Sequence, residues 1–256
     1  MSLPILERAA DWPQVLTARA AEAEVEDLAM AEAGGAWDAW KRATGELSPE
    51  AVVHTIAESG LRGLGGAGYP VGAKWRDCVS QRDPVRYVVA NGFEADPGAQ
   101  LDRVLMERDP HLVVEGLAIA AWAVGAEQAI IAVSSSAPAA GERLNEAIDE
   151  AVDAGYIGHS TAGPSLEIEV RELTGSFMVG EETVLLRALE GARAQPDQRP
   201  PYPSRSGLWG KPTVVNNVKT LASVPWIVAN GAGAFNSLGT AEAPGTTLLQ
   251  LGGAVK

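Results

Sequence analysis

The sequence contains a single cysteine, Cys78, among its 256 residues. One thiol excludes an internal disulfide, and it also excludes an iron–sulfur cluster or zinc site built from this chain's own thiolates. Cys78 follows shortly after Lys74 and Trp75, at a position where a small apolar residue would serve equally well. We therefore expect Cys78 to have a packing role.

The sequence also lacks a long apolar run and an excess of basic residues. It has no stretch of about 20 apolar residues that could span a membrane, and its first residues lack the basic start and apolar core of a signal peptide. Lys and Arg number 20 against 33 Asp and Glu, for a net charge of −13. This balance argues against nucleic acid and anionic membranes as partners. We expect a cytoplasmic protein without direct membrane insertion.

The most informative segment is a glycine-rich run at residues 63–75 that ends in Lys74 and Trp75. Glycines at this density, among them Gly63, Gly65 and Gly66, allow a sharp turn with uncovered N–H groups that a flat or phosphorylated ligand can approach. Lys74 adds a point charge for a phosphate or a reduced ring. The spacing matches neither a P-loop nor a dinucleotide fingerprint. By itself, the run could equally be an ordinary tight loop.

The rest of the chain predicts an α/β protein with a parallel sheet covered by helices. Buried strands are expected at residues 86–91 and 128–133, and a half-exposed strand at 166–173. Helical patterns are expected at residues 9–45, 48–60, 102–125 and 138–155. Strands that alternate with helices favour a parallel sheet, and 46% hydrophobic residues suffice for one large core.

Polar residues gather in the turns after these strands, where ligands of parallel sheets bind. Asn91, Glu94 and Asp96 follow one strand, and the pair Glu181 and Glu182 follows another. The two glutamates could accept ribose or ribityl hydroxyls, or they could simply be carboxylates favoured at a helix start. A third polar turn at residues 212–220 is expected to place two asparagines at the mouth of a helix, where amides can grip a heterocycle edge.

Four ordered motifs give the chain a close resemblance to a known family. They are residues 59–75 (SGLRGLGGAGYPVGAKW), residues 91–103, residues 180–185 (GEETVL), and residues 200–203 (PPYP) with 207–218 (GLWGKPTVVNNV). Over residues 49–230, these motifs resemble the family of flavin-bearing subunits of NADH dehydrogenases. That family includes the 51-kDa, F-type subunit of complex I and the diaphorase subunits of NAD-linked hydrogenases and formate dehydrogenases.

The resemblance implies a domain that binds FMN and accepts a hydride from NADH, with the flavin rather than a side chain carrying the chemistry. The implied FMN site is Gly63, Gly65, Gly66, Lys74, Asn91, Glu94, Gly180, Glu181, Val215, Asn216 and Asn217. The implied NADH site is Tyr69, Asp96, Glu182, Arg199 and Tyr202. The two tyrosines would offer flat surfaces to the adenine end.

Two other functions stay open at this point. Phe93 and Phe177 stand where the family usually has an acid and a Tyr beside the flavin, so the chain could be a structural or docking homologue. Alternatively, the same site could take electrons from a reduced iron–sulfur protein and reduce NAD⁺.

The resemblance also implies a domain organisation and partners. Residues 1–47 would form an N-terminal helical arm, residues 48–240 the FMN- and NADH-binding α/β domain, and residues 241–256 the start of a truncated ubiquitin-like domain. Electrons would pass to iron–sulfur subunits, including a [2Fe–2S] partner, because this chain cannot hold a cluster. The chain would then be cytoplasmic, with a peripheral place in a membrane-bound or soluble complex.

Overall fold

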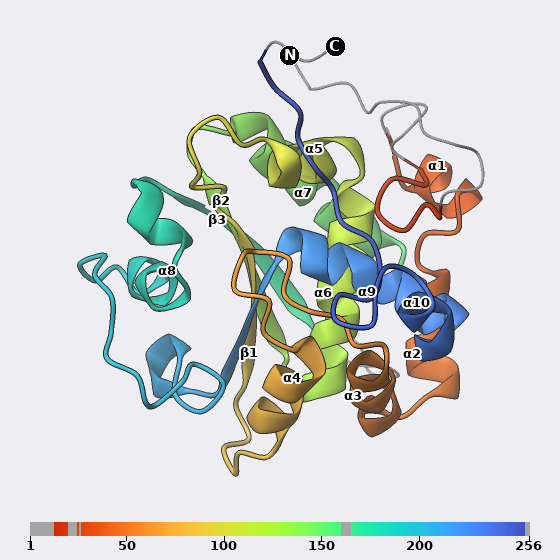
Figure 1. Cartoon of the computed structure of the whole chain (residues 1–256), viewed down its shortest axis with the longest axis horizontal. Helices are drawn as coiled ribbons and strands as arrows, with labels where there is room; N and C mark the ends of the chain where they lie inside the picture. Colours follow the sequence, from red (N-terminus) through yellow and green to blue (C-terminus); the bar gives the residue numbers. More distant parts are fainter. Residues whose placement is uncertain (1–12, 20–24, 26, 160–164, 254–256) are drawn as a thin grey trace.

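The structure is a computed structural model that describes residues 13–19, 25, 27–159 and 165–253 (Figure 1). Its helices are α1 (Leu28–Ala33), α2 (Asp38–Glu46), α3 (Pro49–Glu58), α4 (Val71–Val79), α5 (Leu101–Arg108), α6 (Pro110–Val124), α7 (Pro138–Asp153), α8 (Glu182–Leu189), α9 (Val218–Asn230) and α10 (Ala232–Asn236). Its strands are β1 (Tyr87–Gly92), β2 (Gln128–Ser134), β3 (Glu167–Leu173) and β4 (Thr213–Asn217), and the 3₁₀ helices are η1 (Phe177–Gly180) and η2 (Leu208–Gly210).

Within the described residues, the four strands form one parallel sheet in the order β3-β2-β1-β4. This confirms the α/β class and the parallel sheet expected from the sequence. The chain runs outward from β1 to β2 and β3, and then returns to place β4 on the other side of β1. The strand order therefore reverses between β1 and β4, which is where open parallel sheets bind ligands beyond their carboxyl ends.

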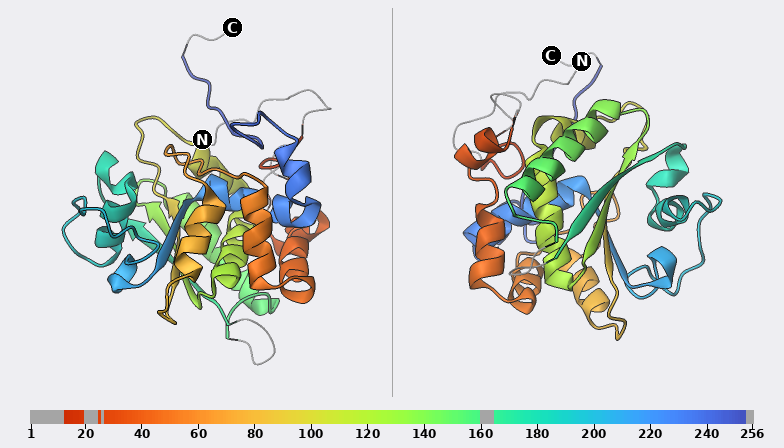
Figure 2. Two further views of the ribbon diagram at one scale, coloured as in Figure 1. Left: turned by 60° about the horizontal axis from the view of Figure 1, so that its bottom comes forward. Right: turned by 180° about the vertical axis from the view of Figure 1, so that it is seen from behind.

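Helices cover both faces of the sheet, and alternate residues of each strand enter the two cores. On one face, Val88 and Ala90 of β1 belong to a large core shared with α6, α7 and α9. On the other face, Val89 belongs to a smaller core completed by α8 and Leu208. Figures 1 and 2 show α8 on one side of the sheet, together with short 3₁₀ turns, and the larger group of helices on the other side.

The predicted helix at 48–60 has the expected signals at both of its ends. Ser48 caps α3 by accepting a hydrogen bond from the amide of Ala51, and Pro49 occupies the first turn. Gly60 follows the helix with a φ of 70°, in the left-handed region that glycine tolerates.

Three sequence-based expectations need correction. The helical pattern at 102–125 is two helices, because Pro110 lacks an N–H and Asp109 caps α6 through the amide of Leu112. The pattern at 9–45 contains, in the described part, only α1 and α2, with turns at residues 13–19 and a glycine pair, 34–35, between the helices. Trp12, which falls in the same predicted helix, lies outside the described residues.

The third correction concerns the polar turn predicted at residues 212–220, in which residues 213–217 form a strand. β-Branched Thr213, Val214 and Val215 favour extended backbone, and β4 pairs with β1 so that Asn217 lies opposite Asn91. The helix expected after the asparagines does begin at Val218, and Asn217 is its N-cap.

At the chain's end, no strand is present in the described residues 246–253. The start of a ubiquitin-like domain stays a prediction. Among the described residues, no helix combines the length and the apolar character that a membrane span requires.

Candidate functional site

A cleft of about 990 Å³ lies at the carboxyl end of the sheet, where β1 and β4 meet. Its walls come from the glycine loop and α4, from the start of α8, and from the segment around Tyr202. The lining residues are Gly63, Gly65, Ala67, Gly68, Tyr69, Ala73, Lys74, Arg76, Asp77, Asn91, Gly180, Glu181, Glu182, Arg199, Tyr202, Pro203, Ser204, Arg205, Val215, Asn216 and Asn217. The four segments singled out in the sequence therefore converge on one site.

The glycine loop is closed at its base and open at its tip. The amide of Gly63 donates to the carbonyl of Tyr69 at 2.9 Å, and Arg62 donates to the carbonyl of Gly68 at 3.1 Å. Gly68 has a φ of 61° and open space where a side chain would stand. A Cβ at Gly65 would lie only 3.0 Å from the Cβ of Asn217. Glycine thus lets the loop pass close to Asn217, and backbone is exposed to the cleft at Gly68.

Lys74 stands at the centre of a row of charged groups. Its Nζ donates to the carbonyl oxygen of Val215 at 2.9 Å and to Glu182 Oε2 at 3.2 Å. The other oxygen of Glu182 accepts from Arg199 at 3.0 Å. Glu182 is therefore held between two cations, both of which line the cleft.

Glu181 has the helix-start role that the sequence left open. One of its oxygens, Oε2, accepts from the amides of Thr183 at 2.9 Å and Val184 at 3.1 Å, and also from the Thr183 hydroxyl. Its other oxygen lies 3.4 Å from Arg199. The carboxylate satisfies first-turn amides of α8 and at the same time lines the cleft.

Asn216 and Asn217 are held in different ways. Trp75 Nε1 donates to Asn216 Oδ1 at 2.9 Å, which fixes the orientation of that amide. Asn217 Nδ2 donates to buried Asp102 at 2.5 Å and to the carbonyl of Asn91 at 3.3 Å, while its Oδ1 caps α9. Both asparagines line the cleft, and Asn217 is tied by its amide nitrogen to Asp102 and to the backbone of β1.

Three predicted site residues, Gly66, Glu94 and Asp96, do not line the cleft. Glu94 accepts from the amides of Leu101, Asp102 and Arg103 at 2.7 to 3.3 Å, and so caps α5. Burial and the nearby Asp102 carboxylate raise the pKa of Glu94. Gly66 lies at the tip of the glycine loop with a φ of 113°. Asp96 belongs to the turn before α5, where its carbonyl accepts from the amide of Ala99.

Phe93 and Phe177, which departed from the family pattern, also lie outside the cleft lining. Phe93 is buried in the smaller core with Val179 and Val184. Phe177 belongs to η1, and 62% of its surface is exposed. Neither ring occupies the cleft.

Sequence reasoning missed a polar group in the lining of the cleft, formed by Asp77, Ser204 and Arg205. Asp77 lies three residues after Lys74, on the same side of α4, and this helical spacing was the available signal. The pairing with Ser204 and Arg205 had no local signal, because more than 120 residues separate the partners.

Cys78 is buried in the large core, as its predicted packing role requires. Burial raises the pKa of its thiol to about 12. We expect the folded protein to resist a thiol reagent such as dithionitrobenzoate at pH 8, because the thiolate is the reactive form. One thiol should react after unfolding in guanidinium. Rapid reaction of the folded protein would contradict the buried position.

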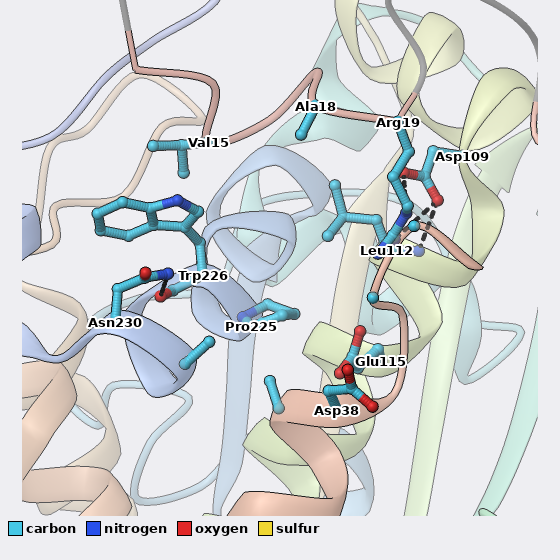
Figure 3. Close-up of a pocket in the computed structure, with 14 residues that line it drawn as sticks. Val15, Ala18, Arg19, Asp38, Asp109, Leu112, Glu115, Pro225, Trp226 and Asn230 are labelled. Atoms are coloured by element: carbon cyan, nitrogen blue, oxygen red, sulfur yellow. Dashed lines mark hydrogen bonds and ion pairs between the residues drawn. The ribbon is translucent and has the colours of Figure 1, made fainter. Parts of the chain in front are cut away.

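A second cavity of about 270 Å³ lies away from the sheet edge, between the N-terminal segment and helices α6 and α9 (Figure 3). Arg19 and Asp109 form a two-pronged ion pair at its wall, with both bonds at 2.9 Å. Glu115 is 1% exposed, accepts from the amide of Trp40 at 3.1 Å, and has its pKa raised by burial to about 7.

The buried Glu115 predicts how stability depends on pH. Because its pKa is higher in the folded chain, the folded state binds a proton that the unfolded state releases between about pH 4.5 and 7. Stability therefore falls as pH rises through this window. The advantage of Glu115→Gln over the wild type in urea unfolding should grow by about 2–3 kcal/mol between pH 5 and pH 8. Glu46→Gln, at an exposed site, is the control, and an equal difference at both pH values would contradict the prediction.

Comparison with known proteins places the chain among flavin-bearing subunits of oxidoreductases. It is 42% identical over 231 residues to an F-type subunit of the NADH-quinone oxidoreductase of Rhizobium meliloti, covering 90% of this chain and 55% of that protein. It is also 42% identical to the HndC subunit of the NADP-reducing hydrogenase of Solidesulfovibrio fructosivorans, covering 82% of this chain and 43% of that one. The chain spans about half the length of these relatives.

The fold is shared with a solved structure described as an NAD⁺-reducing [NiFe]-hydrogenase in the H₂-reduced state. The TM-score is 0.73 at 38% identity, over 77% of this chain and 34% of that chain. The family model of the Nuo51 FMN-binding domain matches residues 56–226, which include the glycine loop, both glutamates and both asparagines of the cleft. The chain therefore belongs to the Nuo51 FMN-binding domain family, as its sequence motifs predict.

Proposed function

We propose that this chain is an FMN-dependent NADH dehydrogenase module that passes electrons from NADH to an iron–sulfur partner. The observation that carries the proposal is the cleft at the β1–β4 reversal, which combines exposed glycine backbone, one ammonium and an oriented amide. A volume of about 990 Å³ is at the upper end of small-molecule sites, as a flavin with a stacked nicotinamide requires. The residues present therefore fit FMN.

When bound, FMN would supply the two-electron chemistry, by accepting a hydride from NADH. The chain's own residues would bind the flavin and orient it. Lys74 offers an ammonium that Val215 and Glu182 hold in place, and Asn216 offers amide donors fixed by Trp75. Gly68 lets a flat ring approach the main chain, because the space where a side chain would stand is open, whereas Gly65 lets the loop pass close to Asn217.

We place the NADH part of the site in the same cleft. Tyr69 and Tyr202 line it, and each residue is 55% exposed, so each has a ring surface free for an adenine. Glu182 would sit near the ribose and disfavour a 2′-phosphate. Since one relative belongs to an NADP-reducing hydrogenase, family membership alone leaves the choice of nucleotide open, and the local charges decide it.

The first test is the identity of the flavin. The purified chain should be yellow, and acid release followed by chromatography should yield FMN and not FAD, because the matching family model is that of an FMN-binding domain. Addition of NADH without oxygen should bleach the yellow flavin absorbance. FAD, or no flavin after reconstitution, would reject the proposal and favour the structural or docking homologue.

The position of Phe93 and Phe177 favours the active module over the docking homologue. Both departures from the family pattern lie outside the cleft lining, so neither ring blocks the proposed flavin site.

The reverse reaction, reduction of NAD⁺, would use the same site. The reduction potential of the iron–sulfur partner decides the direction in which electrons flow. A relative that is named as an NAD⁺-reducing hydrogenase supports keeping this alternative.

A second test concerns the electron acceptor. Iron–sulfur carriers take one electron at a time, and a cluster generally needs four ligands, whereas this chain offers only the buried thiol of Cys78. The isolated chain should therefore contain no stoichiometric iron and should reduce ferricyanide with NADH, but not a protein acceptor on its own. A [2Fe–2S] protein is the partner we propose. Stoichiometric iron in the 256-residue chain would reject this assignment.

A further inference from the structure

The segment that bears Tyr202 projects from the body of the protein and needs a fixed position if its ring is to bind a ligand. No helix or strand is present from residue 191 to 207, and residues 190–202 are exposed. Tyr202 begins a tight turn, in which its carbonyl accepts from the amides of Arg205 at 2.9 Å and Ser206 at 3.1 Å. One backbone bond, from Thr213 to the carbonyl of Pro203 at 2.8 Å, ties the turn to β4.

The carboxylate of Asp77 joins this turn to helix α4, which also lines the cleft. Asp77 Oδ2 accepts from the Ser204 hydroxyl at 2.6 Å, and both Asp77 oxygens accept from Arg205, through Nε at 3.1 Å and Nη2 at 2.9 Å. Two-pronged pairing of a guanidinium with a carboxylate fixes geometry as well as distance. The Ser204 bond adds a second point of attachment, so the turn cannot simply pivot about the ion pair.

Asp77 is also rigidly linked to Tyr69. Helix α4 begins at Val71, two residues after Tyr69, and Asp77 lies within that helix. The Tyr69 hydroxyl lies near enough to Arg205 to add to the rise in the pKa of the guanidinium, which is caused mainly by Asp77. The two tyrosines that line the cleft therefore stand on elements that meet at this one carboxylate.

We propose that Asp77, with Ser204 and Arg205, is a positioning clamp that sets the spacing of Tyr69 and Tyr202 and so determines the affinity of the cleft for the adenosine half of the nucleotide. This inference rests on the proposed binding of NADH in this cleft. Asp77 touches none of the reacting atoms, so its loss should weaken binding of the nucleotide and leave the hydride step unchanged. An interaction lost equally in the ground state and the transition state raises KM without lowering kcat.

The size of the effect follows from the exposure of the pair. The side chains of Asp77 and Arg205 are 27% and 61% exposed, so solvent screens their attraction and the clamp acts through geometry more than through charge. Removing it should therefore weaken nucleotide binding by roughly 5-fold and not abolish it.

The experiment compares Asp77→Ala, Arg205→Met and the double variant with the wild type. ADP-ribose, which carries the adenosine half and no nicotinamide, is titrated by calorimetry, and NADH oxidation is followed with ferricyanide. Each single variant should bind ADP-ribose about 5-fold more weakly, with KM for NADH raised in proportion and kcat and FMN content within about twofold of the wild type. The double variant should resemble the single ones, because both remove the same contact.

The matched control is Lys211→Met. Lys211 pairs with Asp83 at 3.0 Å and also joins the region after α4 to the segment before β4, but neither residue lines the cleft. This variant should bind ADP-ribose as the wild type does. Equal weakening in Lys211→Met and Asp77→Ala, or unchanged affinity in Asp77→Ala, would overturn the clamp while leaving the proposed function intact. A wild type that binds FMN but neither ADP-ribose nor NADH would instead overturn the proposed nucleotide site.

Discussion

Replacing Lys74 with alanine is expected to weaken the binding of FMN by roughly 10-fold or more, since a charge-assisted hydrogen bond contributes about 1–3 kcal/mol. Lys74 is the ammonium that lines the cleft, and it also offsets the charge of Glu182 at 3.2 Å. Its loss would remove a partner for the flavin and leave Arg199 as the remaining cation beside Glu182, so that less of the carboxylate's charge is offset near an anionic phosphate. The two effects act in the same direction.

The measurement is the dissociation constant of FMN, obtained from quenching of flavin fluorescence on titration with flavin-free protein. Lys41→Ala is the control, because it removes the same charge from an exposed ion pair with Asp38, away from the cleft. An unchanged dissociation constant in Lys74→Ala would show that Lys74 serves only to hold Glu182 and β4 together.

Much of the fold could be predicted because its signals are local. The strands at β1 and β2 are short β-branched runs, and α3 has a serine cap and a proline in its first turn. The strand β4 was missed because its two asparagines are typical of turns, although the three residues before them favour a strand. Its pairing with β1 is a tertiary contact that outweighs this local preference.

The site could be predicted in part, for a similar reason. The glycine loop, Lys74 and the glutamate pair lie near strand ends or in a motif, so the sequence alone brings them to one edge of the sheet. Glu94 also follows a strand end, but it does not line the cleft. Its carboxylate accepts hydrogen bonds from the amides at the start of α5, which have no partner within the helix. The role of Asp77 could not be predicted, because Ser204 and Arg205, which it contacts, are distant in the sequence.

Replacing Glu182 with glutamine is expected to reduce the preference for NADH over NADPH by roughly 10-fold or more. A carboxylate near the ribose repels a 2′-phosphate by about 1–3 kcal/mol in a partly shielded site. In this structure, Glu182 also neutralises Lys74 at 3.2 Å and Arg199 at 3.0 Å. Glutamine would therefore remove a repelling group and release two cations that attract the phosphate. The change should appear as a lower KM for NADPH, with kcat little altered.

The dependence on salt separates this explanation from a change in shape. If the freed Lys74 and Arg199 attract the 2′-phosphate, the gain in NADPH affinity of Glu182→Gln should shrink as ionic strength rises, because salt screens partly exposed charges. Glu190→Gln, at the other end of α8 and outside the cleft, is the control and should keep the wild-type preference. If the wild type already used NADPH as well as NADH, the Glu182 carboxylate would be only a first-turn residue of α8, and its position between two cations would serve the stability of the cleft wall.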